Sequence, residues 1–398
     1  MLNLDNFYRA RYVLKDVVRR TDLIAAPKLN AKCNIWLKPE NLQITGSFKV
    51  RGAYYKISQL SDEEKKRGVI ACSAGNHAQG VALGATHCGI KSLICLPEGA
   101  PISKAEATRR YGAEICLVPG VYDDAYQKAL QLRDEFGYTF VHPFNDENVI
   151  AGQGTIGLEL LDQLPNVDAV FVPVGGGGLI SGVAFAIKSL NPNIKVYGVQ
   201  AEGAPSMFNS IEHHAIERLS KVRTFADGIA VKEPGNITYD VCQKYVDGFV
   251  TVSEDEICAA ILALMEQHKL IAEGAGAVSV AAAMYDKVPL DGKNVICLVS
   301  GGNIDVNILN RIVSRGLGMG GRSACFMFEL EDKPGQLVGI AEIIARLGGN
   351  VIGVDHSRSS DTKDVLACQL SIRVETRNAA HIEEIRKALL DAGFHMIG

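Results

Sequence analysis

The stretch VIACSAGNHAQGVALGA (residues 69–85) passes from an apolar run to a polar glycine turn and then to small residues that suit a helix. The run Val69–Cys72 has the apolar, β-branched character of a buried strand. Ser73, Asn76 and His77 stand together in the turn that follows it. In a sheet of parallel strands, the turns after the strands form the edge at which ligands bind. This stretch therefore predicts an α/β fold with a ligand site in this turn.

The same strand-like character recurs along the first three quarters of the chain. Further apolar runs rich in Val and Ile are NIWLK (34–38), SLICLP (92–97), EICLVP (114–119), DAVFVPV (168–174), KVYGVQ (195–200), GFVTV (248–252) and NVICLVS (294–300). Helical stretches lie between them, among others at 101–111, 122–136 and 152–164. Strands that are apolar on both faces and alternate with helices indicate a largely parallel sheet covered by helices on both sides.

The sequence changes in character near residue 316. The segment RGLGMGGRSA (315–324) is rich in glycine and predicts a flexible linker over 316–324. After it, strand-like and helix-like segments follow one another in the order βαββαβ, the ferredoxin-like plan, and end in FHMIG (394–398). We therefore expect a first domain at 1–315, with a smaller lobe at about 45–145 inserted in a larger one, and a second domain at 325–398.

Composition excludes several classes of protein. The chain has 398 residues, 47% of them hydrophobic and 22% charged, with a formal net charge of −4, so nothing favours nucleic acid or an anionic membrane as partner. We expect a cytoplasmic protein, because the sequence has neither a signal-peptide pattern nor an apolar run long enough to span a membrane. The ten cysteines form no C-x-x-C pair, which indicates reduced, buried thiols.

A second glycine turn, Gly175–Gly178, lies between an apolar run and a helix expected to begin near Leu179. Free backbone N–H groups at such a turn can bind an anion, most simply a phosphate, although tight packing alone also explains glycine there. The spacing does not match G-x-G-x-x-G, because Ile180 or Ser181 stands where the last glycine belongs. A nicotinamide-dependent dehydrogenase is therefore disfavoured.

Lys49 lies in TGSFKVRGA (45–53), between Phe48 and Val50. An amine in apolar surroundings loses solvation, which lowers its pKa and makes it a better nucleophile, whereas a solvated surface lysine would have ordinary chemistry. A fourth polar turn, LVSGGN (298–303), follows another predicted strand. A phosphate cradle, a reactive lysine and two further polar strand ends are together the parts that a pyridoxal phosphate site needs.

Taken in order, SFKVRGA, SAGNHAQG, GGGGL and SGGN resemble the motifs of the fold-type II (tryptophan synthase β-like) pyridoxal phosphate enzymes. The resemblance covers about residues 5–320 and is strongest to the threonine dehydratase (threonine ammonia-lyase) group. The tail, with DKPGQL (332–337) at a strand-to-helix turn, resembles an ACT domain. Together, the two resemblances imply a PLP-dependent catalytic domain at 1–315 and a regulatory ACT domain at 325–398.

The resemblance also implies a role for each motif. Lys49 would hold the cofactor as a Schiff base and remove the α-proton of the substrate. The cofactor phosphate would lie on Gly175, Gly176, Gly177, Gly178 and Leu179. Ser300 would hydrogen-bond the pyridine nitrogen, Asn76 the 3-hydroxyl, and Phe48 would pack beside the ring. The substrate carboxylate would bind at Ser73, Ala74, Gly75, Asn76 and His77.

The implied reaction converts L-threonine to 2-oxobutanoate and ammonia, and L-serine to pyruvate. Serine dehydratases and serine racemases of the same fold are the alternative, and a non-catalytic amino-acid sensor is a third reading. Serine racemases carry a second serine at the position of Ala74, and its hydroxyl can protonate the intermediate. The methyl group of Ala74 has no proton to give, so elimination is favoured over racemisation. The sulfur-transferring β-synthases of this fold usually carry Thr at the position of His77, and the threonine synthases usually carry Asp at the position of Val50. Both groups are therefore disfavoured for this chain.

The remaining expectations concern partners. An ACT tail implies an amino-acid or nucleotide effector and a homo-oligomer, either a dimer or a tetramer. Some relatives bind a cation after the strand KVYGVQ, where Glu202 could supply a ligand, although a plain surface loop explains it equally well.

Overall fold

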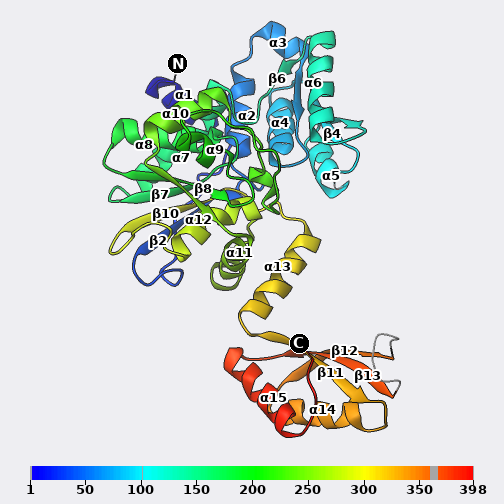
Figure 1. Ribbon diagram of the computed structural model, residues 1–398. Helices are drawn as coiled ribbons and strands as arrows, with labels where there is room; N and C mark the ends of the chain where they lie inside the picture. Colours follow the sequence, from blue (N-terminus) through cyan, green and yellow to red (C-terminus); the bar gives the residue numbers. More distant parts are fainter. Residues whose placement is uncertain (1, 101, 359–365, 398) are drawn as a thin grey trace. The chain divides into compact units, whose positions relative to one another are not determined.

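A computed structural model describes residues 2–100, 102–358 and 366–397 (Figure 1). The chain divides into two compact units, the first ending at Ile304 and the second beginning at Asp305. Each unit has its own sheet or sheets and its own buried core, so the two are described separately.

The larger sheet of the first unit has the strand order β1-β2-β10-β7-β8-β9. All neighbouring strands in it are parallel, except that the short β1 runs antiparallel to β2. Its strands are β1 (Ile24–Ala25), β2 (Asn34–Pro39), β7 (Ala169–Pro173), β8 (Lys195–Ala201), β9 (Gly248–Val252) and β10 (Asn294–Val299).

The smaller sheet is formed by the stretch of chain between β2 and β7. Its order is β5-β4-β3-β6, entirely parallel, with β3 (Val69–Cys72), β4 (Ser92–Pro97), β5 (Glu114–Val118) and β6 (Thr139–Phe140). All eight apolar runs singled out in the sequence are strands, which confirms the predicted parallel α/β fold. The smaller sheet and its helices lie beside the larger sheet in Figure 1.

Helices cover both sheets. They are α1 (Leu4–Leu14), α2 (Lys49–Ser58), α3 (Asp62–Arg67), α4 (Asn76–His87), α5 (Ile102–Arg110), α6 (Tyr122–Phe136), α7 (Glu147–Gln163), α8 (Gly178–Leu190), α9 (Ser206–Glu212), α10 (Asn236–Tyr245), α11 (Glu254–His268) and α12 (Gly274–Met284), with the 3-10 turns η1 (Glu40–Leu42) and η2 (Asp227–Ile229). The predicted helix at 152–164 begins earlier, at Glu147. The side chain of Asp146 caps it by accepting hydrogen bonds from the backbone N–H groups of Asn148 and Val149.

A buried cluster of four charged side chains fixes the start of α2. Arg51 donates to Glu40 at 2.8 Å and to Glu159 at 2.6 Å, and Lys38 donates to Glu159 at 2.6 Å. These residues come from α2, η1, α7 and β2, and the guanidinium of Arg51 is fully buried. The two cations balance the two carboxylates, so the cluster ties the N-terminal turn of α2 to its surroundings without leaving a bare charge.

In its described residues, the second unit has the antiparallel sheet β11-β13-β12 and the helices α13, α14 and α15. Its elements are α13 (Val306–Met319), β11 (Ser323–Glu331), α14 (Gln336–Arg346), β12 (Asn350–Ser357), β13 (Ala367–Glu375) and α15 (Ala379–Asp391). The helices α14 and α15 pack with one face of the sheet around an apolar core that includes Phe328, Ile344 and Ile385.

Two expectations for this part of the chain were wrong. The segment 316–324 is no free linker, because α13 continues through it to Met319, with the N–H of Gly320 bonded to the carbonyl of Gly316 at 2.9 Å, and β11 begins at Ser323. The short last strand in FHMIG is reduced to a single bridge between Met396 and Phe328. Residue 398 lies outside the described residues.

Two broader expectations can also be compared with the fold. In the described part of the chain, no helix has both the length and the apolar character needed to cross a membrane. All ten cysteines carry free thiols, and most are buried as predicted. Cys88 and Cys116 are partly exposed, and Cys325 is exposed, because it lies on the face of β11 away from the helices.

Candidate active site

The four sequence motifs meet in one cavity of about 970 Å³ in the first unit. Its walls come from the ends of strands in both sheets and from the start of α2. The predicted site residues that line it are Phe48, Lys49, Ser73, Ala74, Gly75, Asn76, His77, Gly175, Gly176, Gly177, Gly178, Leu179 and Ser300. A volume of this size is in the range of small-molecule and cofactor sites.

The turn before α2 is paired with the turn after β10. The N–H of Phe48 donates to the carbonyl of Ser300 at 3.1 Å, and the N–H of Gly302 donates to the carbonyl of Gly46 at 2.9 Å. Gly46 has a φ of +70°, a conformation that favours glycine. This pairing brings Lys49, the first residue of α2, next to Ser300.

Lys49 presents its amine to the cavity. Its Nζ donates to the carbonyl of Pro143 at 3.1 Å and lies 5.1 Å from the ring centre of Phe48. Burial lowers the pKa of Lys49 to about 8, although the carboxylate of Glu273 partly opposes that shift. A substantial fraction of the amine is therefore unprotonated, and so nucleophilic, at mildly alkaline pH.

The turn after β3 leads into α4, which begins at Asn76. The N–H of Gly75 donates to the hydroxyl of Ser73 at 3.2 Å, and the first N–H groups of α4 have no partner within the helix. An anion is favoured at such a helix start. Ala74 lines the cavity in the same turn.

The side chain of His77 has a structural role. Its Nε2 lies 2.8 Å from the carbonyl oxygen of Val141, to which it donates, and only 3% of the residue is exposed. Burial, with a smaller effect from Lys49, lowers the pKa of His77 to about 3. The ring is therefore neutral at physiological pH.

The glycine run opens α8 at Gly178, and Gly177 has a φ of +95°. A Cβ at Gly176 would collide with the ring of Phe144, and one at Gly178 would come within 2.8 Å of the Cα of Phe144. No larger side chain fits, so glycine lets the wall pack closely while the helix start faces the cavity.

Three side chains in the cavity form a hydrogen-bonded row. The Nδ2 of Asn76 donates to the Oε1 of Glu273 at 2.6 Å, and the Nδ2 of Asn303 donates to the Oδ1 of Asn76 at 2.7 Å. Glu273 is only 4% exposed. Burial, followed by the charge of Asp227, raises the pKa of Glu273 to about 7.

Two further polar groups line the cavity. The Nδ1 of His142 accepts from the N–H groups of Phe144 and Asn145 at 3.2 and 2.8 Å, which leaves the proton of the ring on Nε2. Burial lowers the pKa of His142 to about 4, so it is a neutral hydrogen-bond donor. The hydroxyl of Ser300 donates to the carbonyl of Ala275 at 3.3 Å.

Glu202 does not join these residues. Its side chain is exposed. Among the described residues, the group of acidic, His or Cys side chains close enough to share a metal ion is Asp332, His356 and Cys368, in the second unit. Arg358 already donates to the carboxylate of Asp332 at 2.6 Å, so that carboxylate is paired with a cation.

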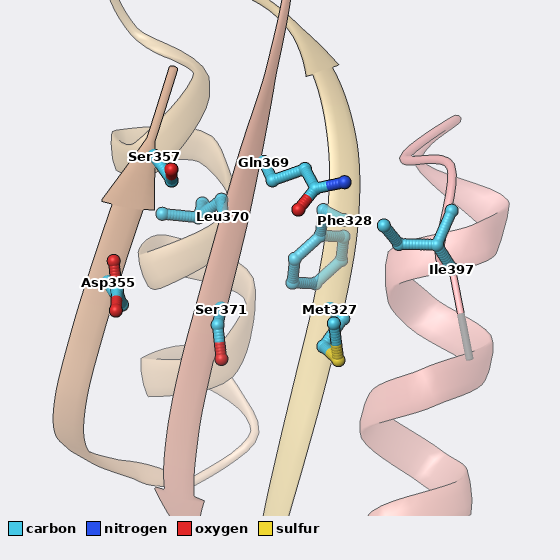
Figure 2. Close-up of a pocket in the computed structure, with 8 residues that line it drawn as sticks. All are labelled: Met327, Phe328, Asp355, Ser357, Gln369, Leu370, Ser371 and Ile397. Atoms are coloured by element: carbon cyan, nitrogen blue, oxygen red, sulfur yellow. The ribbon is translucent and has the colours of Figure 1, made fainter. Parts of the chain in front are cut away.

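A hollow of about 140 Å³ lies on the sheet of the second unit, lined by Met327, Phe328, Asp355, Ser357, Gln369, Leu370, Ser371 and Ile397 (Figure 2). Of the described residues that line it, Asp355 carries the one charged side chain.

Comparison with known families decides what the large cavity binds. A family model described as "Pyridoxal-phosphate dependent enzyme" matches residues 14–301, which include every motif of the cavity apart from the end of SGGN. The chain belongs to this family. Pyridoxal phosphate (PLP) is accordingly its cofactor, and the two parallel sheets are those of the fold-type II α/β enzymes of this family.

Relatives within the family agree on an amino-acid substrate. The chain is 50% identical over 398 residues to the L-threonine ammonia-lyase of Thermotoga maritima, covering 100% of this chain and 99% of the relative. Threonine deaminase isoform 2 of Solanum lycopersicum is 39% identical with a TM-score of 0.74, covering 79% of this chain and 94% of that one. Maize serine racemase is 33% identical with a TM-score of 0.75, covering 80% and 98%.

The cavity fits this family's cofactor. It has an amine for the aldehyde, in Lys49, and a glycine-lined helix start for the phosphate, at Gly175–Gly178. Ser300 and Asn76, which line the same cavity, would offer neutral polar groups to the pyridine nitrogen and the 3-hydroxyl. Phe48, which is 8% exposed, adds an apolar surface against which the ring can pack.

Sequence reasoning missed Glu273, Asn303 and His142. Glu273 was visible as a lone acid in the apolar stretch LIAEGAGAVSV (270–280), and Asn303 as the last residue of SGGN. His142 sits in VHPFND (141–146), just beyond a strand of only two residues. A lone acid or histidine carries little information until the fold shows which cavity it faces.

Proposed function

We propose that this protein is a PLP-dependent threonine ammonia-lyase that converts L-threonine to 2-oxobutanoate and ammonia, and L-serine to pyruvate by the same steps. The observation that carries the proposal is the amine of Lys49, with a pKa of about 8, in one cavity with the Gly175–Gly178 helix start and Ser300. The names of the relatives, above all the one 50% identical over 398 residues, support the choice of substrate.

Each residue has a distinct part in this reaction. When bound, the cofactor withdraws electrons from the α-carbon of the amino acid, which makes its hydrogen acidic. Lys49, as the neutral amine, takes that proton. The N–H groups at the start of α4 and the hydroxyl of Ser73 hold the substrate carboxylate and so orient the α-hydrogen toward Lys49.

Ser300 and Asn76 set the ring's electronic state. A serine hydroxyl donates a hydrogen bond to the ring nitrogen without adding a negative charge, so the ring remains a weaker electron sink than beside a carboxylate. Because a hydroxyl has one proton, Ser300 must turn from the carbonyl of Ala275 to make this bond. Charge that stays near the α-carbon favours loss of the β-hydroxyl over transamination.

Serine racemase is the second candidate, because maize serine racemase shares the fold at 33% identity. Ala74 argues for the lyase. A racemase needs a second proton donor on the opposite side of the α-carbon from Lys49, and the methyl group of Ala74 on the cavity wall cannot serve.

We propose further that the second unit is an ACT-type regulatory domain that binds an amino-acid or nucleotide effector and joins copies of the chain into a dimer or tetramer. The order β11-α14-β12-β13-α15, and the left-handed Gly335 (φ +95°) just before α14, support this. An effector would act by binding one conformation of the enzyme more tightly than another.

The central test combines colour and turnover. Purified protein supplied with PLP should absorb in the visible region, and borohydride should fix the cofactor on Lys49, as mass spectrometry of the digested protein will show. Lys49→Arg is the matched control, which keeps the charge but not the nucleophile. Failure to label Lys49, or no release of 2-oxobutanoate from L-threonine, would refute the proposal.

A further inference from the structure

The carboxamide of Asn76 is held at both ends. Its Nδ2 donates to Glu273 at 2.6 Å, while its Oδ1 accepts from the Nδ2 of Asn303 at 2.7 Å. The Nδ2 of Asn303 also donates to the carbonyl of Thr45 at 2.8 Å, which can only accept. The orientation of Asn303 therefore dictates that of Asn76.

Turning the Asn76 amide over would set like groups against each other. Its NH₂ would face the NH₂ of Asn303, and its oxygen would face the carboxylate of Glu273. The contact with Asn303 loses its hydrogen bond in a buried site, and the contact with Glu273, when that residue is ionised, brings two acceptors together. One amide orientation is thus strongly preferred, with the second N–H of Asn76 left over for the cavity that Asn76 lines.

The surrounding glycines leave room for this row of side chains. A Cβ at Gly301 would collide with the Oε1 of Glu273 and come within 3.2 Å of the Nδ2 of Asn76. A Cβ at Gly46 would collide with the Oδ1 of Asn303. Two of the motif glycines are therefore explained by the row itself, rather than by contact with the cofactor.

We infer that Glu273 and Asn303 are positioning residues. They hold Asn76 so that it offers an N–H, and not its carbonyl oxygen, to the oxygen of the 3-hydroxyl of PLP. This rests on the role proposed above for Asn76. An N–H stabilises negative charge on that oxygen, whereas a carbonyl oxygen in the same place repels it.

Reversing the polarity of the row tests the inference. In Glu273→Gln alone, the amide oxygen of the new glutamine can still accept from Asn76. The dissociation constant for PLP should therefore change by no more than about twofold, and the absorption maximum of bound PLP should not shift. Asn303→Asp places a carboxylate against the Oδ1 of Asn76. PLP should then bind about tenfold more weakly, as expected for one lost hydrogen bond, with a shifted absorption maximum.

The double variant Asn303→Asp/Glu273→Gln separates orientation from stability. The new carboxylate at position 303 would accept from Asn76, and the new carboxamide at position 273 would donate to it, so the Asn76 amide is held again but turned over. The midpoint of unfolding without cofactor should recover in part relative to Asn303→Asp alone, because the carboxylate at position 303 still faces the carbonyl of Thr45, while PLP affinity and the absorption maximum stay altered. Asn34→Ala is the control, because it breaks an Asn–Asn hydrogen bond with Asn294 outside the cavity. It should change neither the PLP affinity nor the absorption maximum.

Asn76→Ala separates the role of the Asn76 side chain from the orientation of its amide. If it leaves PLP affinity and absorption unchanged, the proposed role of Asn76 fails. If it alters them while the double variant binds and absorbs like the unchanged protein, the orientation of the amide is irrelevant and the inference is overturned. Asn303→Ala provides a milder disruption with the same expected direction should Asn303→Asp fold poorly.

Discussion

The guanidinium of Arg51 donates two hydrogen bonds to the carboxylate of Glu40, each 2.8 Å long. Both side chains are completely buried, and Arg51 stands two residues after Lys49 in α2. Neither residue lines the cavity, so this ion pair bears on the reactive amine only through the helix that both Arg51 and Lys49 belong to.

Replacing Arg51 with methionine should lower the free energy of unfolding by about 3–5 kcal/mol, because Glu40 and Glu159 would share only the charge of Lys38. Urea denaturation of the cofactor-free protein measures this. Lys66→Met, which breaks an exposed pair with Glu63, is the control and should cost no more than about 0.5 kcal/mol. A loss under about 1 kcal/mol for Arg51→Met would mean that the cluster is not needed for folding.

Uptake of PLP by the cofactor-free protein should depend on pH through Lys49. Burial lowers the pKa of this amine to about 8, and only the unprotonated amine attacks an aldehyde. The initial rate of uptake should therefore rise with pH and level off above a midpoint near 8. Stopped-flow absorbance from pH 6 to 10 measures it, and a midpoint near that of a free lysine, about 10.4, would contradict the desolvated site.

Much of the fold was predictable from the sequence because its strands are buried on both faces. Runs such as Val69–Cys72 and 295–299 are apolar throughout, and no helical period competes with them. The start of α7 was not predictable in the same way, because its first turn is polar and only the cap at Asp146 defines it. The glycines of α13 likewise suggested a linker, since propensity alone cannot show that a helix continues through them.

The candidate site was predictable where its parts lie at strand ends and unpredictable where they depend on long-range contacts. Lys49 and Ser300 are found in motifs that each follow or precede a strand-like run. The contact between Asn76 and Glu273 joins positions 197 residues apart, so no local pattern announces it. The same holds for His142, whose tautomer is set by the turn in which it sits.

The turn at Gly335 offers a test of regulation in the full chain. Gly335→Val strains a left-handed position at the start of α14, where open space surrounds the glycine, so the cost is local and about 1 kcal/mol. We expect the rate with L-threonine alone to stay unchanged, while any response to isoleucine, valine or a nucleotide weakens. Steady-state rates with and without each compound measure this, and an undiminished response in the variant would place the effector elsewhere.

Ala74→Ser should raise the racemase activity of the enzyme, which we expect to be small beside its elimination activity. The new hydroxyl would stand on the cavity wall in the turn after β3. The resemblance to serine racemases, which carry a serine at this position, implies that it would protonate the α-carbon from the side opposite Lys49. D-serine formation from L-serine should rise by about 10²-fold, the lower end of what a positioned proton donor contributes, and pyruvate formation should fall as the two routes compete. Chiral chromatography measures both products, and Ala74→Gly, which changes the side chain without adding a hydroxyl, should form no more D-serine than the unchanged enzyme. If the unchanged enzyme already forms D-serine as fast as pyruvate, the methyl group of Ala74 does not decide between the two reactions.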